Sequence, residues 1–271
     1  MALIALTSAK GAPGVTTTAI ALAIAWPRPC LLIEADVAGT SSILAGYFRG
    51  AVTHDRGLID LAEAHRRGAL TEGLHRASIP LNDQSHARIV PGLRSPAQAP
   101  TMLRLWEPLA AVLQGLESTG TDVLIDAGRY IPETGPLPLL READLTLLVT
   151  QTGLPAIAAA RVVAGILRED LMSRGTGEDA LRLLTVGDGR PFSNREAKRV
   201  INLPVATSIA WDPDAAAVLS DGAQPGRRWT SSSLVRSARA SAATLNQLIG
   251  ARRTRLAPGA VVDHEELNQH A

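Results

Sequence analysis

The stretch that decides the fold lies at the start of the chain, where residues 2–26 read ALIALTSAKGAPGVTTTAIALAIAW. Residues 2–8 form an apolar run typical of a buried strand, residues 9–15 are punctuated by glycine and proline, and residues 16–26 are rich in apolar helix formers. A glycine-bearing loop that enters a helix directs backbone N–H groups and the positive end of the helix dipole toward its ligand. The stretch therefore predicts a strand, a phosphate-binding loop and a helix.

The eight residues 9–16 match the P-loop pattern G-x-x-x-x-G-K-[ST] only in part. Gly14 and Thr16 occupy the positions of the second glycine and of the hydroxyl that binds magnesium. Ala9 replaces the first glycine, and Val15 replaces the phosphate-binding lysine. The alternative interpretation is an ordinary connection between a strand and a helix.

Lys10 favours the phosphate-binding interpretation, because the chain has only two lysines, Lys10 and Lys198, among its 27 basic residues. Residues 10–17 read K-G-A-P-G-V-T-T and resemble the deviant P-loop of the ParA/MinD family, which is usually K-G-G-x-G-K-T-T. The resemblance implies that Lys10 reaches across a nucleotide-sandwich dimer to the partner's phosphates. It implies bound ATP and Mg²⁺, with nucleotide contacts from Lys10, Gly11, Ala12, Pro13, Gly14, Val15, Thr16 and Thr17.

Two further apolar runs end in acidic residues. Residues 30–36 read CLLIEAD and residues 121–128 read TDVLIDAG. The carboxyl ends of buried parallel strands are where open α/β sheets bind ligands, so Asp36 and Asp126 are candidate site residues. The runs resemble the second and third motifs of the same family. That resemblance implies that Asp36 positions the attacking water, and that Thr16, Asp36 and Asp126 serve the magnesium ion. For Asp36 the alternative is a simple turn residue.

Composition limits the possible classes of protein. The chain has 271 residues, a formal net charge of +1 and a single cysteine. A net charge this close to zero gives no global attraction to nucleic acid or membrane, and one cysteine excludes a disulfide framework or a multi-cysteine metal cluster. No targeting segment or membrane span is evident, so we expect a cytoplasmic protein.

Strands alternate with helical segments along the rest of the chain, which predicts a doubly wound α/β fold with a mostly parallel sheet. Helix-like patterns cover residues 43–48, 103–116 and 155–171, and strand-like runs cover residues 87–91, 143–150, 181–186 and 204–209. We expect one nucleotide-binding domain over residues 1–250. Residues 251–271 are expected to form a polar, disordered tail.

Candidate base contacts lie late in the chain. Asp188 follows the strand predicted at residues 181–186, where the family commonly has an asparagine. Its carboxylate can accept hydrogen bonds from a guanine edge, although a turn residue is the simpler interpretation. Trp211, Asp212 and Pro213 occupy the position of the family's loop that packs against the base, and Trp211 either stacks on the base or fills the core.

The last predicted helix spans residues 232–249, and arginines cluster around it. ParA-type relatives bind DNA without sequence preference through basic residues in this region, by neutralising phosphates. MinD-type relatives end in a membrane-binding amphipathic helix, but the acidic tail here favours DNA, and a solvated charged face is the alternative. The candidate DNA-binding residues are Arg227, Arg228, Arg236, Arg239, Arg252, Arg253 and Arg255.

The sequence thus favours a slow ATPase that acts as a nucleotide-dependent, homodimeric switch in partitioning or intracellular positioning, read or stimulated by a partner protein. A nucleoid location would follow from DNA binding. Because Val15 replaces a lysine, the principal alternative is a pseudo-ATPase scaffold that keeps the fold but binds nucleotide poorly. A metabolic ligase on the same fold would need a polar substrate constellation, and the sequence shows none.

Overall fold

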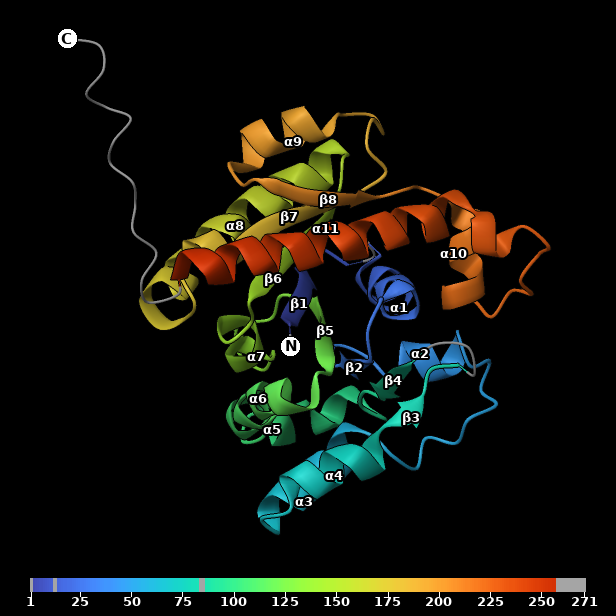
Figure 1. Ribbon diagram of the computed structural model, residues 1–271, viewed down its shortest axis with the longest axis vertical. Coiled ribbons are helices and arrows are strands. Elements are labelled where there is room, and N and C mark those ends of the chain that lie inside the picture. Colours follow the sequence, from blue (N-terminus) through green and yellow to red (C-terminus); the bar gives the residue numbers. More distant parts are fainter. Residues whose placement is uncertain (1, 12–13, 83–85, 257–271) are drawn as a thin grey trace.

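The computed structural model describes residues 2–11, 14–82 and 86–256 of the chain. Its centre is an eight-stranded sheet, seen nearly edge-on in Figure 1. The strand order is β3 (Ile79–Pro80), β4 (Ala87–Val90), β2 (Cys30–Glu34), β5 (Asp122–Arg129), β1 (Leu3–Ser8), β6 (Leu145–Gln151), β7 (Leu181–Val186) and β8 (Val205–Ile209). All neighbouring strands pair parallel except β3 and β4, which confirms the predicted mostly parallel α/β sheet.

Helices cover both faces of the sheet, because the parallel strands are apolar on both sides. Along β5, Val123 and Ile125 pack on one face and Leu124 packs on the other. The first face is covered by α3 (Leu58–Arg66), α4 (Leu70–Ala77), α5 (Ala99–Met102), α6 (Trp106–Gly115), α7 (Leu137–Arg141), α8 (Leu154–Arg174) and α9 (Asn194–Ile201). The second is covered by α1 (Val15–Ala25), α2 (Ser42–Ala45), α10 (Pro213–Ser220) and α11 (Ser233–Leu256).

Helix α1 lies next to α11 on the second face (Figure 1). Its sequence, VTTTAIALAIA, contains no charged residue, and most of its residues are buried. This burial fixes the helix rigidly behind the loop that precedes it. The strand, loop and helix predicted for residues 2–26 are therefore present, with the helix starting at Val15.

The central position of β1 places that loop at the middle of the sheet edge. Strand β1 lies between β5 and β6, while β2 pairs on the far side of β5. Strand β2 therefore lies on one side of β1, and β6 lies on the other. Where the strand order reverses in this way, a crevice opens at the carboxyl ends of the strands. Residues that follow β1, β2 and β5 meet at this edge.

The structure differs from the predictions in three places. The helix predicted at residues 103–116 begins only at Trp106, as α6, while the separate short helix α5 ends at Met102, before the predicted range, and β3 has no counterpart among the predicted strands. The last helix continues to Leu256, well beyond residue 249, so residues 251–256 are helical and do not belong to a disordered tail. Residues 257–271 lie outside the described part of the chain. Over the described ranges, none of the helices is long and apolar enough to cross a membrane.

Candidate nucleotide site

The described glycines of the loop between β1 and α1 leave open space of the kind that suits a phosphate cradle. Gly14 adopts the left-handed conformation with φ of 86°, and a Cβ atom at Gly11 or Gly14 would meet nothing within 4 Å. The Ser8 hydroxyl donates a hydrogen bond to the carbonyl oxygen of Lys10 at 3.0 Å, which fixes the exit from the strand. The predicted contacts of Ala12 and Pro13 lie outside the described residues.

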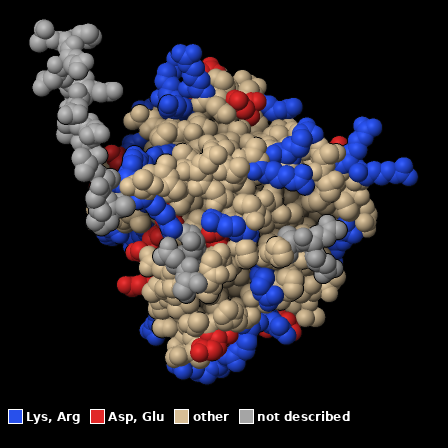
Figure 2. Space-filling view, in the orientation of Figure 1, with Lys and Arg blue, Asp and Glu red and all other residues tan. Residues whose placement is uncertain are grey.

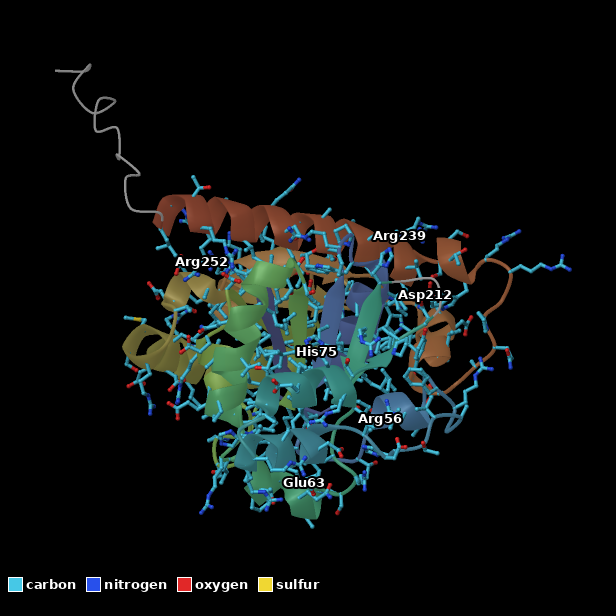
Figure 3. All side chains as sticks on the ribbon, turned by 60° about the horizontal axis from the view of Figure 1, so that its bottom comes forward. Arg56, Glu63, His75, Asp212, Arg239 and Arg252 are labelled. Carbon is cyan, nitrogen blue, oxygen red and sulfur yellow. The ribbon has the colours of Figure 1, made fainter. Side chains whose placement is uncertain are left out.

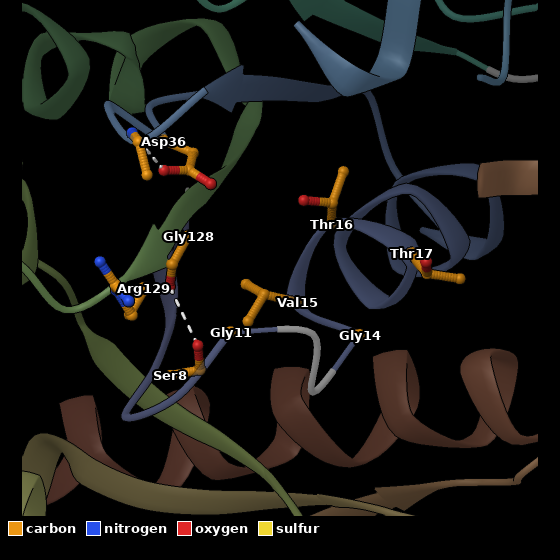
Figure 4. A pocket seen from close by; sticks show the side chains of 10 residues that line it. Ser8, Gly11, Gly14, Val15, Thr16, Thr17, Asp36, Gly128 and Arg129 are labelled. Atoms are coloured by element: carbon orange, nitrogen blue, oxygen red, sulfur yellow. Dashed lines mark hydrogen bonds between the residues drawn. The ribbon is translucent and has the colours of Figure 1, made fainter. Parts of the chain in front are cut away.

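This loop borders a cavity of about 390 Å³ at the sheet edge (Figure 4). Its walls come from three segments far apart in sequence: the loop with the start of α1, the residues after β2 and the end of β5. The lining residues are Ser8, Gly11, Gly14, Val15, Thr16, Thr17, Asp36, Ala38, Gly128 and Arg129. The structure therefore brings Asp36 to the predicted phosphate-binding residues.

Asp36 lies just beyond β2, with one carboxylate oxygen held by the chain. Its Oδ1 accepts a hydrogen bond from the backbone N–H of Ala38 at 2.8 Å. Burial raises the pKa of Asp36, while the Ala38 N–H and the nearby positive charge of Arg129 oppose the rise. Figure 4 shows the second carboxylate oxygen directed toward the pocket. Asp36 can thus accept a hydrogen bond from a molecule bound there.

Asp126 is fully buried behind this cavity at the end of β5. Its Oδ1 accepts a hydrogen bond from the Gly128 N–H at 3.0 Å, whereas its Oδ2 has no partner. Burial raises the pKa of Asp126 to about 7, although the neighbouring Thr16 side chain opposes the rise. Buried polar atoms are normally satisfied, so an unpartnered carboxylate oxygen next to a threonine hydroxyl fits a site for a hydrated cation.

Glu34, the acid two residues before Asp36, has a different role. It accepts hydrogen bonds from the Ser41 hydroxyl at 2.5 Å and from the N–H groups of Ile43 and Gly92 at 3.2 and 2.9 Å. Its carboxylate therefore ties the segment after β2 to the segment after β4. The side chain is 2% exposed and does not line the cavity.

Lys10 lies on the other side of the loop from Asp36. It borders a separate cavity of about 370 Å³, formed with the end of β6 and the start of α8. Lys10 is not among the residues that line the first cavity. Within a single copy of the chain, Lys10 therefore does not supply the positive charge that is missing at Val15.

The predicted base contacts separate in the structure. Trp211, Asp212 and Pro213 line a cavity of about 270 Å³ that also includes Gly14 and Thr17. Asp212 caps α10 and accepts a hydrogen bond from the Ser233 hydroxyl at 2.8 Å, which lowers its pKa and occupies its oxygens. Trp211 is 43% exposed and available for stacking.

Asp188 does not line any of these three cavities. Its Oδ1 accepts a hydrogen bond from the Asn194 N–H at 2.7 Å. This contact is that of a turn residue, the simpler of the two interpretations drawn from the sequence.

The seven candidate DNA-binding arginines fall into two groups at opposite ends of α11, as the labels of Arg239 and Arg252 show in Figure 3. At the C-terminal end, Arg252 is 5% exposed and pairs with Asp179 at 3.0 Å. Arg253 pairs with Asp144 at 2.9 Å, and Arg255 lies 3.8 Å from Asp179. These three side chains hold the helix to the body of the protein.

The other group lies at the N-terminal end of α11 and in the loop before it, where Figure 2 shows basic side chains projecting from the surface. All four side chains are exposed, and none forms an ion pair with a described residue. We refer to them as the N-terminal arginines: Arg227, Arg228, Arg236 and Arg239. They are the members of the predicted set that remain available to phosphates.

Sequence reasoning did not single out Ser8 or Arg129. Ser8 carries no recognisable motif, and only its hydrogen bond to the loop reveals its role. Arg129 directly follows Gly128, the last residue of the run at 121–128, and a charged residue at the exit of a buried strand was the available signal. Across the described residues, no group of three His, Cys, Asp or Glu side chains could hold a metal ion. The predicted magnesium ligands are Thr16, Asp36 and Asp126. They differ from such a group because one of the three is a hydroxyl.

The fold resembles several solved structures, whereas the sequence matches no protein-family model and no curated protein. The cell division ATPase MinD of Pyrococcus furiosus is 19% identical, with a TM-score of 0.70 over 92% of this chain and 100% of that one. MinD of Pyrococcus horikoshii OT3, complexed with Mg-ADP, is 19% identical, with a TM-score of 0.68 over 92% and 97%. A ParA family ATPase from Chlorobium tepidum TLS is 18% identical, with a TM-score of 0.67 over 89% and 98%.

These likenesses confirm that the chain has the nucleotide-binding fold of MinD and ParA-type ATPases, as the resemblance of its motifs predicts. At such low identity they establish the fold alone. The activity of this chain has to be argued from its own residues.

Proposed function

We propose that this protein is a nucleotide-dependent switch that binds ATP with Mg²⁺ in the cavity between the β1–α1 loop and Asp36. The observation that carries the proposal is the buried carboxylate of Asp126, whose Oδ2 has no partner and lies behind that cavity beside Thr16. A buried, unsatisfied carboxylate costs stability, so its retention fits a ligand that satisfies it. The Mg-ADP bound to a structural neighbour is of the same chemical kind.

In this proposal each group of described residues has its own role. The N–H groups of the loop and the start of α1 cradle the phosphates. Thr16 and Asp126 hold the cation and its water, and Asp36 orients the attacking water through its pocket-facing oxygen. The magnesium ion would neutralise charge on the phosphates. Hydrolysis is slow because Val15 offers no positive charge.

We further propose that nucleotide binding drives formation of a homodimer. Lys10 is exposed on the outer side of the loop and does not line this chain's own cavity, as expected of a side chain that serves a partner's phosphates. The dimer would act in DNA partitioning or intracellular positioning and be read by a further protein. The N-terminal arginines are the candidate contact with non-specific DNA, in a cytoplasmic, nucleoid-associated protein.

The second candidate is a scaffold that keeps the fold without the chemistry, and Val15 favours it. Loss of a charge-assisted phosphate contact costs about 1.5 to 3 kcal/mol, or about ten- to a hundredfold in affinity. Such a loss could leave nucleotide unbound at cellular concentrations.

Equilibrium binding of labelled ATP, ADP and GTP with magnesium separates the two candidates, with oligomer mass followed in the same samples. We expect the wild type to bind ATP and dimerise, and Lys10→Ala to bind more weakly and remain monomeric. Lys198→Ala is the matched control, because Lys198 is the other lysine of the chain and lies on α9, away from the site. A nucleotide-independent oligomer that binds none of the three would support the scaffold.

Hydrolysis is measured separately on the same preparations. We expect slow, magnesium-dependent release of phosphate that Asp36→Ala abolishes without reducing ATP binding. Release that is unaffected by Asp36→Ala would contradict the role given to that carboxylate.

A further inference from the structure

The candidate phosphate site needs a positive charge that its own loop does not supply. The side chain at the usual lysine position is Val15, which is 5% exposed and borders the cavity. Lys10 faces a different cavity. Of the residues described as lining the first cavity, Arg129 alone is basic.

Arg129 reaches this position through an irregularity in β5. Strand β1 pairs with β5 in regular register up to Leu6 and Asp126, but the next pair joins Ser8 to Arg129, so β5 contains one extra residue. Such a bulge changes which side chain faces a given side of the sheet, and bulges commonly re-aim side chains near functional sites. Here the extra residue brings position 129 opposite Ser8, on the side of the sheet where Asp126 lies.

Glycine makes this bulge possible. Gly128 has φ of 58°, and a Cβ atom at that position would lie 2.2 Å from Cγ of Asp36. The backbone around it is fixed by hydrogen bonds from the Tyr130 N–H to the Ser8 carbonyl at 2.8 Å and from the Thr7 hydroxyl to the Gly128 carbonyl at 3.2 Å. The end of β5 is thus held against Asp36, and Arg129 is fixed at the rim of the pocket.

The guanidinium group of Arg129 is not used by the fold. The residue is exposed, and its side chain makes no hydrogen bond or ion pair with any residue that the structure describes. Its charge opposes the rise in the pKa of Asp36 that burial causes. Figure 4 shows Arg129 next to Gly128, across the pocket from the start of α1. A planar guanidinium matches two phosphate oxygens at once.

We propose that Arg129 binds the phosphate chain of the nucleotide and supplies, from the end of β5, the positive charge that the loop lacks at Val15. This inference rests on the proposed nucleotide-binding function. The positive charge then comes from the chain that binds the nucleotide, so a monomer can bind nucleotide before Lys10 of a second copy arrives.

The test compares affinities for Mg-ATP and for AMP, which lacks the β- and γ-phosphates. We expect Arg129→Ala to weaken Mg-ATP binding about ten- to a hundredfold, with little change for AMP. Arg129→Lys keeps the charge but not the two-pronged geometry, so a smaller loss is expected. Arg104→Ala is the matched control, because Arg104 is exposed and lines none of the described cavities.

A second variant tests whether the charge itself matters. Val15→Lys restores the usual lysine, and we expect it to recover most of the Mg-ATP affinity in the Arg129→Ala background. In the Val15→Lys background, removal of Arg129 should then cost less than it does in the wild type. Independent, additive effects of the two substitutions would overturn the idea that Arg129 replaces the lysine.

The outcomes separate the two proposals. If the wild type binds no nucleotide, the proposed function fails. If the wild type binds Mg-ATP and Arg129→Ala binds it equally well, the function stands and the role of Arg129 is wrong. An equal loss for Mg-ATP and AMP would also contradict a phosphate-chain contact.

Discussion

The nucleotide edge and the C-terminal end of α11 both gather charged residues, but they use them differently. At the nucleotide edge, Oδ2 of Asp126 is buried without a partner, and Arg129 makes no ion pair with a described residue. At the end of α11, Arg252 pairs with Asp179, and Arg253 pairs with Asp144. The second region uses its charges to hold a helix in place.

The difference shows how to distinguish functional from structural charges in this fold. A charge paired within the chain lowers the free energy of the folded state and needs no ligand. An unpartnered buried carboxylate raises that free energy, and its presence at a cavity points to a ligand. Stability and ligand binding should therefore respond in opposite ways when charges are removed from the two regions.

The largest loss of stability is expected for Arg252→Ala. The side chain is almost fully buried and donates to Asp179 and to the carbonyl oxygen of Thr176. Removal of one partner of a buried pair typically costs about 3 to 5 kcal/mol, and the partial exposure of Asp179 places the expected value near the lower end. Urea denaturation measures this loss, and Arg239→Ala, on the same helix, should change the free energy of unfolding by less than about 0.5 kcal/mol.

Asp126→Asn should have the opposite effect on stability. Burial raises the pKa of Asp126 to about 7, against about 3.9 in an unfolded chain. The folded state therefore binds more protons between these values, so the wild type loses stability as the pH rises from about 4 to about 7. Without magnesium, the variant should exceed the wild type at pH 8 by on the order of 4 kcal/mol and match it at pH 4.

The same variant should lose magnesium-dependent nucleotide binding. Urea denaturation at pH 4, 6 and 8 and equilibrium binding of Mg-ATP measure the two effects. A variant that is no more stable than the wild type at pH 8 would show that Asp126 is not strained in the folded state. Asp188→Asn is the control, because Asp188 lies outside the described cavities.

Gly128→Ala is expected to cost about 1 to 3 kcal/mol of stability, because alanine is strained at a positive φ. The added methyl group would also collide with the carboxylate of Asp36. Nucleotide binding should therefore fall further than stability alone explains, measured at a temperature where the variant is folded. Gly120→Ala is a matched control, since Gly120 also has a positive φ but has open space around it. Equal binding by the two variants would contradict the contact between Gly128 and Asp36.

The smallest change in stability is expected when the N-terminal arginines are replaced by glutamine. These side chains are exposed, so each substitution should change the free energy of unfolding by less than about 0.5 kcal/mol. Binding to random duplex DNA should weaken, and the slope of log affinity against log salt should fall by about 0.9 for each lost phosphate contact. Arg255→Gln, at the opposite end of α11, is the control. DNA binding that is unchanged in the quadruple variant would remove this surface from the proposal.

Local sequence patterns were enough to predict the core of the fold. The runs that became β1, β2, β5 and β6 are mostly apolar because these strands are buried on both faces. The loop glycines and the acidic strand ends lie close in sequence to the strands that position them. These features predicted the cavity and the place of Asp36 in it.

The sequence did not predict which charged side chains pair within the protein, because those pairs join distant segments. Glu34 and Asp36 are two residues apart and read alike in the sequence, yet Glu34 binds the segments after β2 and β4 while Asp36 faces the pocket. The seven arginines read as one cluster, because the residues that pair with three of them lie about 70 to 110 positions away in the sequence.

The sequence by itself determined the order of strands and helices, the glycine-containing loop at Gly14 and the positions of its acidic strand ends. These depend on local backbone preference and on burial along short segments. Only the tertiary structure decided that Arg129 lines the cavity, at the end of a strand with one extra residue, and that Arg252 does not face solvent. Both outcomes depend on pairing between distant segments, where the free energy of a charge is set by neighbours that the local sequence does not contain.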